Sequence, residues 1–127
     1  MSHTATPQSK IATIAIWVLR VLLAALFLFA GTLKLIGVEM EIVVFEQVGL
    51  GQWLRYATGL AEIVGAVALL VPATSAFGAL ILLAVDIGAF GAQVAVLHQD
   101  SIHTVVIAVI LAVLIYVQRD QILDRLR

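Results

Sequence analysis

The stretch WLRYATGLAEIVGAVALLVPATSAFGALILLAVDIGAFGAQVAVLH, residues 53–98, decides the fold. It contains two long apolar runs that meet at Pro72, and each run carries one carboxylate deep inside it, Glu62 or Asp86. Each run is close to the length of about 20 residues that a membrane-spanning helix requires. Because the runs show no period of two, they predict helices rather than strands of a barrel. Proline has a fixed φ and no N–H, so we predict a short hairpin turn at Pro72.

Two further apolar runs flank this hairpin. The sequence therefore predicts four spans, at about residues 11–37, 53–71, 73–98 and 102–118. The first run is too long for the core of a cleavable signal peptide, which has about 7–15 apolar residues, so we interpret it as a mature span. The predicted fold is an all-α integral membrane four-helix bundle. Residues 11–118 form its single domain, between a polar N-terminal tail (1–10) and a charged C-terminal tail (119–127).

The composition agrees with this prediction and excludes several classes of protein. Of the 127 residues, 63% are hydrophobic and 12% are charged, against about 45–50% and about 25% in an ordinary globular domain. The chain has no cysteine, which excludes disulfide frameworks, CxxC redox pairs, thiolate zinc sites and cysteine-ligated iron–sulfur clusters. A net charge of -1 gives no basic surface for nucleic acid. The expected surroundings are a lipid bilayer.

The charges outside the spans predict the orientation. The tails carry Lys10, Arg119, Arg125 and Arg127, whereas the connections opposite them carry Glu39, Glu41, Glu46 and Asp100. Positively charged flanks tend to stay in the cytoplasm, so both termini are predicted to be cytoplasmic. An even number of spans likewise requires the two termini to lie on the same side of the membrane. Between the first two spans, residues 38–52 place valines at helical spacing, so this link is either a short interfacial helix or an irregular loop.

Small residues recur at every fourth position in two of the spans. The two ladders are Ala57, Ala61 and Gly65, and then Ala84, Gly88 and Ala92. Such ladders let helix backbones approach closely, within the bundle or between copies of the chain. The alternative interpretation is a binding site lined by backbone.

Ionisable residues inside the apolar runs are the candidates for function, because a charge within a bilayer costs at least a few kcal/mol unless it is paired or hydrated. They are Arg20, Lys34, Arg55, Glu62 and Asp86. At about 1.5 Å per residue from the outer end of each span, Lys34 and Arg55 lie about 5 Å deep, Glu62 about 15 Å, Asp86 about 18 Å and Arg20 about 25 Å. We predict that Lys34 or Arg55 pairs with Glu62, and that Arg20 pairs with Asp86.

These depths predict a polar funnel that opens at the outer side and closes on Glu62. The candidate ligand-binding residues are Lys34, Arg55, Glu62, Asp86, Gln93 and His98, and Arg20 is a candidate for a structural ion pair. The five buried charges leave one positive charge over, for an anion, for a reduced quinone head group or for snorkelling to water. No catalytic residue and no metal site is predicted.

Each candidate also has a purely structural interpretation. Lys34 and Arg55 lie at helix ends, where long side chains snorkel to water. Glu62 and Asp86 could each belong to a structural ion pair or be a protonated, hydrogen-bonded carboxyl. His98 and His103 are five residues apart at the outer turn, where an interfacial role competes with metal binding, and no third ligand is evident nearby.

The strings FLFAGTLKLIG, VGLGQWLRYATGLAEIVGAVALLVP, LHQD and YVQRD, in this order, resemble the DoxX-like family of small membrane proteins. The resemblance covers about Arg20 to Asp120, and Gly31, Lys34 and Glu62 match the family's pattern. Asp86 departs from it, because that part of the third span is mostly small and apolar in the family. The resemblance implies a four-helix bundle in a bacterial cytoplasmic membrane.

The resemblance does not imply a single activity. Relatives include a membrane subunit of a thiosulfate:quinone oxidoreductase and components linked to thiol and superoxide detoxification, while more distant ones act as cargo receptors or assembly chaperones. Our first hypothesis is a redox-associated accessory subunit that holds a quinone or similar amphipathic ligand, with any catalysis belonging to a quinone-linked oxidoreductase. The alternative is a non-catalytic assembly or structural subunit of a larger membrane complex or homo-oligomer. A small solute or proton carrier is the third hypothesis, weakened by the lack of an inverted repeat.

Overall fold

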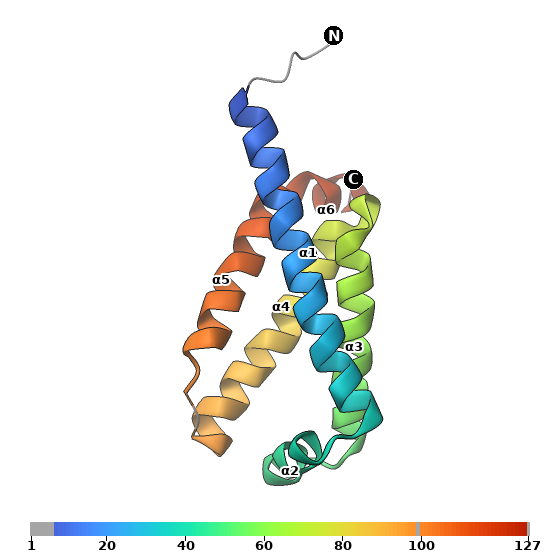
Figure 1. The fold of residues 1–127 in the computed structure, drawn as a ribbon, viewed down its shortest axis with the longest axis vertical. Helices are drawn as coiled ribbons and strands as arrows, with labels where there is room; N and C mark the ends of the chain where they lie inside the picture. Colours follow the sequence, from blue (N-terminus) through green and yellow to red (C-terminus); the bar gives the residue numbers. More distant parts are fainter. Residues whose placement is uncertain (1–6, 99, 127) are drawn as a thin grey trace.

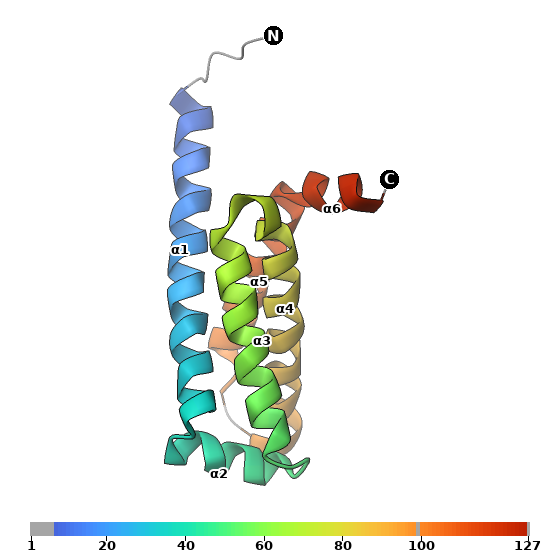
Figure 2. The same ribbon diagram turned by 90° about the vertical axis from the view of Figure 1, so that its right-hand side faces the viewer.

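The computed structural model describes residues 7–98 and 100–126, and every regular element within these ranges is helical. The elements are α1 (Pro7–Ile36), α2 (Glu39–Val48), α3 (Trp53–Leu70), the 3-10 turn η1 (Pro72–Thr74), α4 (Ser75–Ala92), the π-helical turn η2 (Gln93–Leu97), α5 (Ile102–Val117) and α6 (Arg119–Leu126). Helices α1, α3, α4 and α5 run alternately in opposite directions (Figure 1). Helix α2 crosses one end of them, and α6 projects sideways at the other end (Figure 2).

Three stretches among the described helices are long and apolar enough to cross a membrane. They are Lys10–Ile36 within α1, the whole of α3, and the run Pro72–Leu97 formed by η1, α4 and η2. The chain is thus an all-helical membrane protein with several apolar helices able to span a bilayer. Helix α5 is apolar but has only 16 residues, which gives about 24 Å against a hydrocarbon core of about 30 Å. The fourth predicted span, residues 102–118, therefore stays a prediction.

The long helices pack in chain order, α1 against α3, α3 against α4, and α4 against α5. Their shared core consists of Leu23, Ala24, Phe27, Ala66, Leu69, Ala79, Leu82, Leu111 and Leu114. These residues come from the middle of α1, the second half of α3, the first half of α4 and the second half of α5, so the core lies toward the end that carries α6. The N-terminal turns of α1 extend beyond this core (Figures 1 and 2).

Glycines set the two closest helix contacts. A Cβ atom added at Gly31 of α1 would lie 2.8 Å from the carbonyl oxygen of Gly59 in α3. A Cβ atom added at Gly78 of α4 would lie 2.6 Å from the carbonyl oxygen of Gly65 and 2.6 Å from the backbone nitrogen of Leu69. Both contacts are tighter than any residue with a side chain allows, so the helices approach backbone to backbone at these positions.

The first small-residue ladder therefore packs helices only at Gly65, because Ala57 is exposed and Ala61 is half-buried. The second ladder behaves differently. Ala84 and Gly88 are exposed, and a Cβ atom added at Gly88 would meet no other atom within 4 Å. Close packing at the second ladder was one of two predicted alternatives, and it is wrong within this chain.

The link between the first two predicted spans is helical. Helix α1 ends at Gly37, which has a positive φ of 72°, and the N–H groups of Gly37 and Val38 both donate to the carbonyl oxygen of Leu33. Helix α2 then runs to Gly49, whose φ of 81° closes it in the same left-handed conformation. Glycine adopts this backbone conformation without steric cost. The helical alternative for residues 38–52 is thus confirmed over Glu39–Val48.

Candidate functional site

A cavity of about 670 Å³ lies at the end of the bundle that α2 crosses. Residues of α1, α2, α3, α4, η2 and α5 line it, and most of them are apolar. Its polar lining consists of Lys34, Glu41, Thr58, Glu62, Asp86, Gln93, His103 and Thr104. The second small-residue ladder forms part of the wall, because Ala84, Gly88 and Ala92 all line the cavity. Here the small side chains leave space instead of bringing two helices together.

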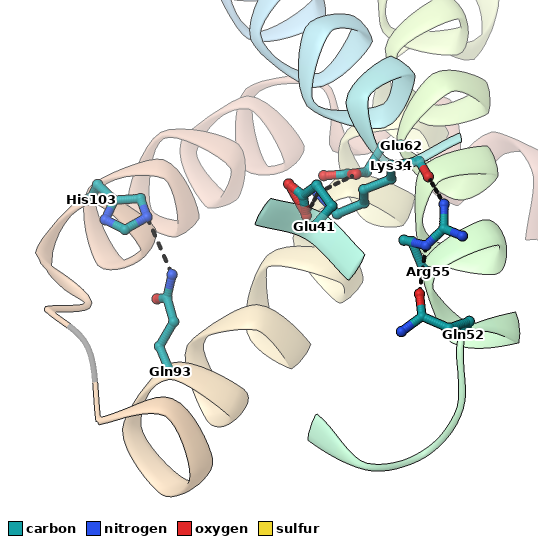
Figure 3. Close-up of polar contacts among 7 residues, drawn as sticks. All are labelled: Lys34, Glu41, Gln52, Arg55, Glu62, Gln93 and His103. Carbon is teal, nitrogen blue, oxygen red and sulfur yellow. Dashed lines mark hydrogen bonds and ion pairs between the residues drawn. The ribbon is translucent and has the colours of Figure 1, made fainter. Parts of the chain in front are cut away.

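Lys34 links three helices at this cavity. Its side chain extends from α1 between Glu41 of α2 and Glu62 of α3 (Figure 3). The Nζ atom lies 3.0 Å from Oε1 of Glu62 and 3.8 Å from Oε1 of Glu41. The contact with Glu62 is an ion pair between two largely buried side chains. The predicted pairing of Lys34 with Glu62 is confirmed.

Arg55 does not pair with Glu62 and does not line the cavity. Its Nε–H donates to Oε1 of Gln52 at 2.7 Å, and its Nη1–H donates to the backbone carbonyl of Lys34 (Figure 3). The last carbonyls of a helix have no partner within the helix, and Arg55 satisfies one of them at the end of α1. Its role in the described structure is to join α3 to α1 beside the cavity.

The predicted ion pair between Arg20 and Asp86 is wrong. Nε–H of Arg20 donates to the carbonyl oxygen of Leu69 at 2.9 Å, and the guanidinium lies 3.8 Å from the centroid of the Trp17 ring. Leu69 is next to the last residue of α3, so Arg20 also satisfies a carbonyl at a helix end. The physical reason is the same as for Arg55. A carbonyl at a helix end has no partner within the helix, and in an apolar setting it needs a hydrogen-bond donor as much as a carboxylate does.

Asp86 is left without the predicted partner. It lines the cavity from the middle of α4, and only 4% of its surface is exposed. Within the described ranges, its Oδ2 atom is buried and accepts no hydrogen bond. Glu62, in contrast, has the ammonium of Lys34 beside it.

Gln93 lines the cavity as predicted, and it connects to two residues that sequence reasoning did not assign to the site. The hydroxyl of Thr104 on α5 donates to Oε1 of Gln93. Nε2 of Gln93 lies 3.3 Å from Nε2 of His103 (Figure 3). Thr104 is buried, whereas His103 is exposed. These contacts close the wall of the cavity between η2 and the start of α5.

His98 lies outside the cavity. It is exposed and has a φ of 53°, the left-handed conformation, and its N–H donates to the carbonyl oxygen of Gln93. This conformation ends η2, so the backbone of His98 terminates the helix, and His98 is not among the residues that line the cavity. The candidate His98 is therefore separated from the other predicted ligand-binding residues.

The five charges counted within the apolar runs include one more cation than carboxylates, whereas the cavity lining has more carboxyl groups than cations. The lining contains one ammonium, Lys34, and three carboxyl groups, Glu41, Glu62 and Asp86. Two facts explain the reversal. Arg20 and Arg55 are committed to backbone carbonyls outside the lining, and Glu41 joins the cavity from α2.

Glu41 is the main residue that sequence reasoning missed, since it was counted only as a loop charge. Five residues of α2 line the cavity, and successive ones are separated by one, three, one and three positions: Met40, Glu41, Val44, Phe45 and Val48. That spacing marks one face of a helix. A helical assignment of the link would have placed Glu41 on the same face as Phe45 and Val48.

Comparison with known proteins supports the fold class. The sequence model of the DoxX-like family matches residues 18–117, which include the whole of α3, α4 and α5 and most of α1. No curated protein and no solved structure shows significant similarity to the chain. The matched residues contain every polar group of the cavity. The chain therefore belongs to the DoxX-like family.

Proposed function

We propose that this protein is a redox-associated accessory subunit that binds a quinone or a similar amphipathic ligand in the cavity between its helices. The observation that carries the proposal is the cavity itself, about 670 Å³ in volume, mostly apolar, with charged groups contributed by four helices. Binding sites for small molecules are typically of about 300–1,000 Å³ and apolar, with a few polar groups that orient the ligand. A ring with polar substituents and an apolar tail matches such a lining.

The membrane arrangement is part of this proposal. We place the protein in a bacterial cytoplasmic membrane, as a single domain with four spans and with both termini in the cytoplasm. The basic residues of the two tails support this orientation. The cavity then lies at the outer side of the membrane, because α2 crosses the end opposite α6 (Figure 2). An amphipath could enter from the outer leaflet.

A second candidate function is assembly within a larger membrane complex or a homo-oligomer. The observation in its favour is the first part of α1, where Ile11, Ile14 and Trp17 are exposed and the helix extends beyond its neighbours (Figure 1). Another membrane protein could pack on this segment. Such a role is compatible with ligand binding at the opposite end.

Native mass spectrometry with lipid extraction tests the proposal. The full chain is purified in mild detergent from its own membrane, together with the variants Glu62→Gln and Glu46→Gln. Glu46 is exposed on α2 and does not line the cavity, so its variant changes the same charge outside the site. We expect a stoichiometric quinone or other amphipath in the wild type and in Glu46→Gln, and its loss in Glu62→Gln. A ligand-free chain bound to larger partners would instead favour the assembly role.

A further inference from the structure

The polar atoms of the cavity are unevenly satisfied. Lys34 lies between two carboxylates, and both polar atoms of the Gln93 side chain are in contact with α5. Oδ2 of Asp86 is different, because among the described residues it is buried, accepts no hydrogen bond and has no ammonium beside it such as Lys34 provides for Glu62. A buried acceptor without a donor costs roughly 1–3 kcal/mol. The most unfavourable polar group in the lining is thus an acceptor.

We infer that the occupant of this cavity presents a hydrogen-bond donor to Asp86, so that the site selects ligands with a hydroxyl or ammonium head group on an apolar tail. The inference rests on the proposed function for the existence of a ligand and adds the chemical class of its head group. For a quinone-like ligand, it means that the reduced, hydroxyl-bearing quinol binds more tightly than the oxidised quinone.

The chemistry of the lining supports this selection. A carboxylate can only accept hydrogen bonds, and three of the five ionisable groups that line the cavity are carboxyl groups. The carbonyl oxygens of a quinone are also acceptors, so they bring no donor to Asp86. The terminal torsion of an aspartate side chain is broad, which allows either carboxyl oxygen to turn toward a bound hydroxyl.

The first test compares three probes that share the same six-membered ring and the same decyl tail. They are a decyl-substituted benzoquinone, its quinol kept reduced without oxygen, and the bis-methyl ether of that quinol, which lacks both donors. The full chain is held in phosphatidylcholine nanodiscs, and binding to empty nanodiscs is subtracted. We expect the quinol to bind about tenfold more tightly than the quinone and the ether, as one satisfied buried acceptor predicts.

Variants of Asp86 then assign this preference to one residue. In Asp86→Leu, which has nearly the same size and no acceptor, the quinol should lose its advantage, so that the ratio of the two affinities falls from about tenfold to about onefold. Asp86→Asn serves as a second variant, because its amide can donate to a quinone carbonyl and should raise the affinity for the quinone. Glu46→Gln is the charge control and should keep the wild-type ratio.

The outcomes separate this inference from the proposed function. The inference is overturned if the wild type binds the quinone as tightly as the quinol or more tightly, or if the ratio of the two affinities is unchanged in Asp86→Leu. The proposed quinone site would stand in either case. If neither quinoid probe binds but decylamine binds and requires Asp86, the donor selection holds and the quinone part of the proposed function fails. If no probe binds in an Asp86-dependent way, the inference is wrong, whatever ligand mass spectrometry finds.

Discussion

The two ends of the bundle are built from the same helices and differ in how they are filled. At the packed end, toward α6, the largest fully buried side chains include Leu69, Leu82, Leu111 and Leu114. At the cavity end, toward α2, the other halves of α3, α4 and α5 surround about 670 Å³ of space lined by Glu62, Asp86 and Thr104. Protein interiors are normally close-packed, so a void of this size has a stability cost. The difference indicates that the packed end holds the fold together, and it supports the proposal that the cavity end binds a ligand.

The most direct test of the difference in packing between the two ends is to add one methyl group at the packed end. In Gly78→Ala the new Cβ atom would lie 2.6 Å from backbone atoms of Gly65 and Leu69, which cannot move aside as a flexible side chain can. We expect the free energy of unfolding to fall by about 3 kcal/mol, as for severe overpacking of a core. Denaturant titration of the full chain in detergent, followed by helical circular dichroism, measures this loss.

The matched control is Gly88→Ala, the same substitution ten residues later on the same helix. Its Cβ atom meets nothing within 4 Å, so the free energy of unfolding should stay equal or rise by about 0.5–1 kcal/mol, the usual gain for alanine over glycine within a helix. Equal losses in the two variants would show that the two ends do not differ in packing.

The second prediction concerns the charges of the cavity end. Lys34→Met leaves Glu62 buried without its ammonium, and we expect the free energy of unfolding to fall by about 2 kcal/mol, since the carboxyl group can take up a proton and avoid a larger penalty. The double variant Lys34→Met with Glu62→Leu should recover most of this loss, because the more buried of the two carboxylates that Lys34 contacts is then removed together with its partner. A double variant as unstable as Lys34→Met would mean that Lys34 acts through Glu41 instead.

A smaller effect is expected at Arg55, which joins the two helices beside the cavity. Arg55→Lys keeps the charge but cannot donate to the Lys34 carbonyl and to Gln52 at the same time, so the free energy of unfolding should fall by about 1 kcal/mol. Arg119→Lys is the control, because Arg119 donates to a single exposed carbonyl, that of Tyr116. If both substitutions lower the free energy of unfolding equally, the two simultaneous hydrogen bonds donated by Arg55 contribute no additional stability.

Much of the fold could be predicted because apolar composition leaves a chain in a bilayer few options. Long runs of Leu, Ile, Val and Ala must satisfy their own backbone groups, and α1, α3 and α4 follow from that rule. The closest contacts could not be predicted in the same way. The spacing of four residues does not distinguish Gly65 from Gly88, yet only Gly65 packs closely against a neighbouring helix, where a Cβ atom would lie 2.8 Å from the side chain of Leu82. Which face of a helix meets a neighbour depends on rotation about its axis, and small residues alone do not fix that rotation.

The site was predicted in part for a similar reason. Depth along the helices gave Lys34 or Arg55 as the partner of Glu62, and the structure has Lys34 in that position, because both side chains are long and lie within reach. The same argument failed for Arg20, since it matched cations only with carboxylates and ignored carbonyl oxygens at helix ends. Every residue has a backbone carbonyl, so the sequence does not mark the carbonyls that need a donor. A guanidinium near a predicted helix end should therefore be tested first against the carbonyls of that end.

The smallest expected change in stability comes from filling the cavity. Leucine at Gly88 has open space for its Cβ atom and lies in the wall beside Asp86, so Gly88→Leu should change the free energy of unfolding by no more than about 0.5 kcal/mol. The same side chain occupies volume that an amphipath would need, and we expect the ligand detected by native mass spectrometry to be lost. A variant that keeps both its stability and its ligand would place the ligand elsewhere on the protein. If Gly88→Leu keeps its stability and loses the ligand, the packed end stabilises the fold by itself and the cavity end is needed only for binding.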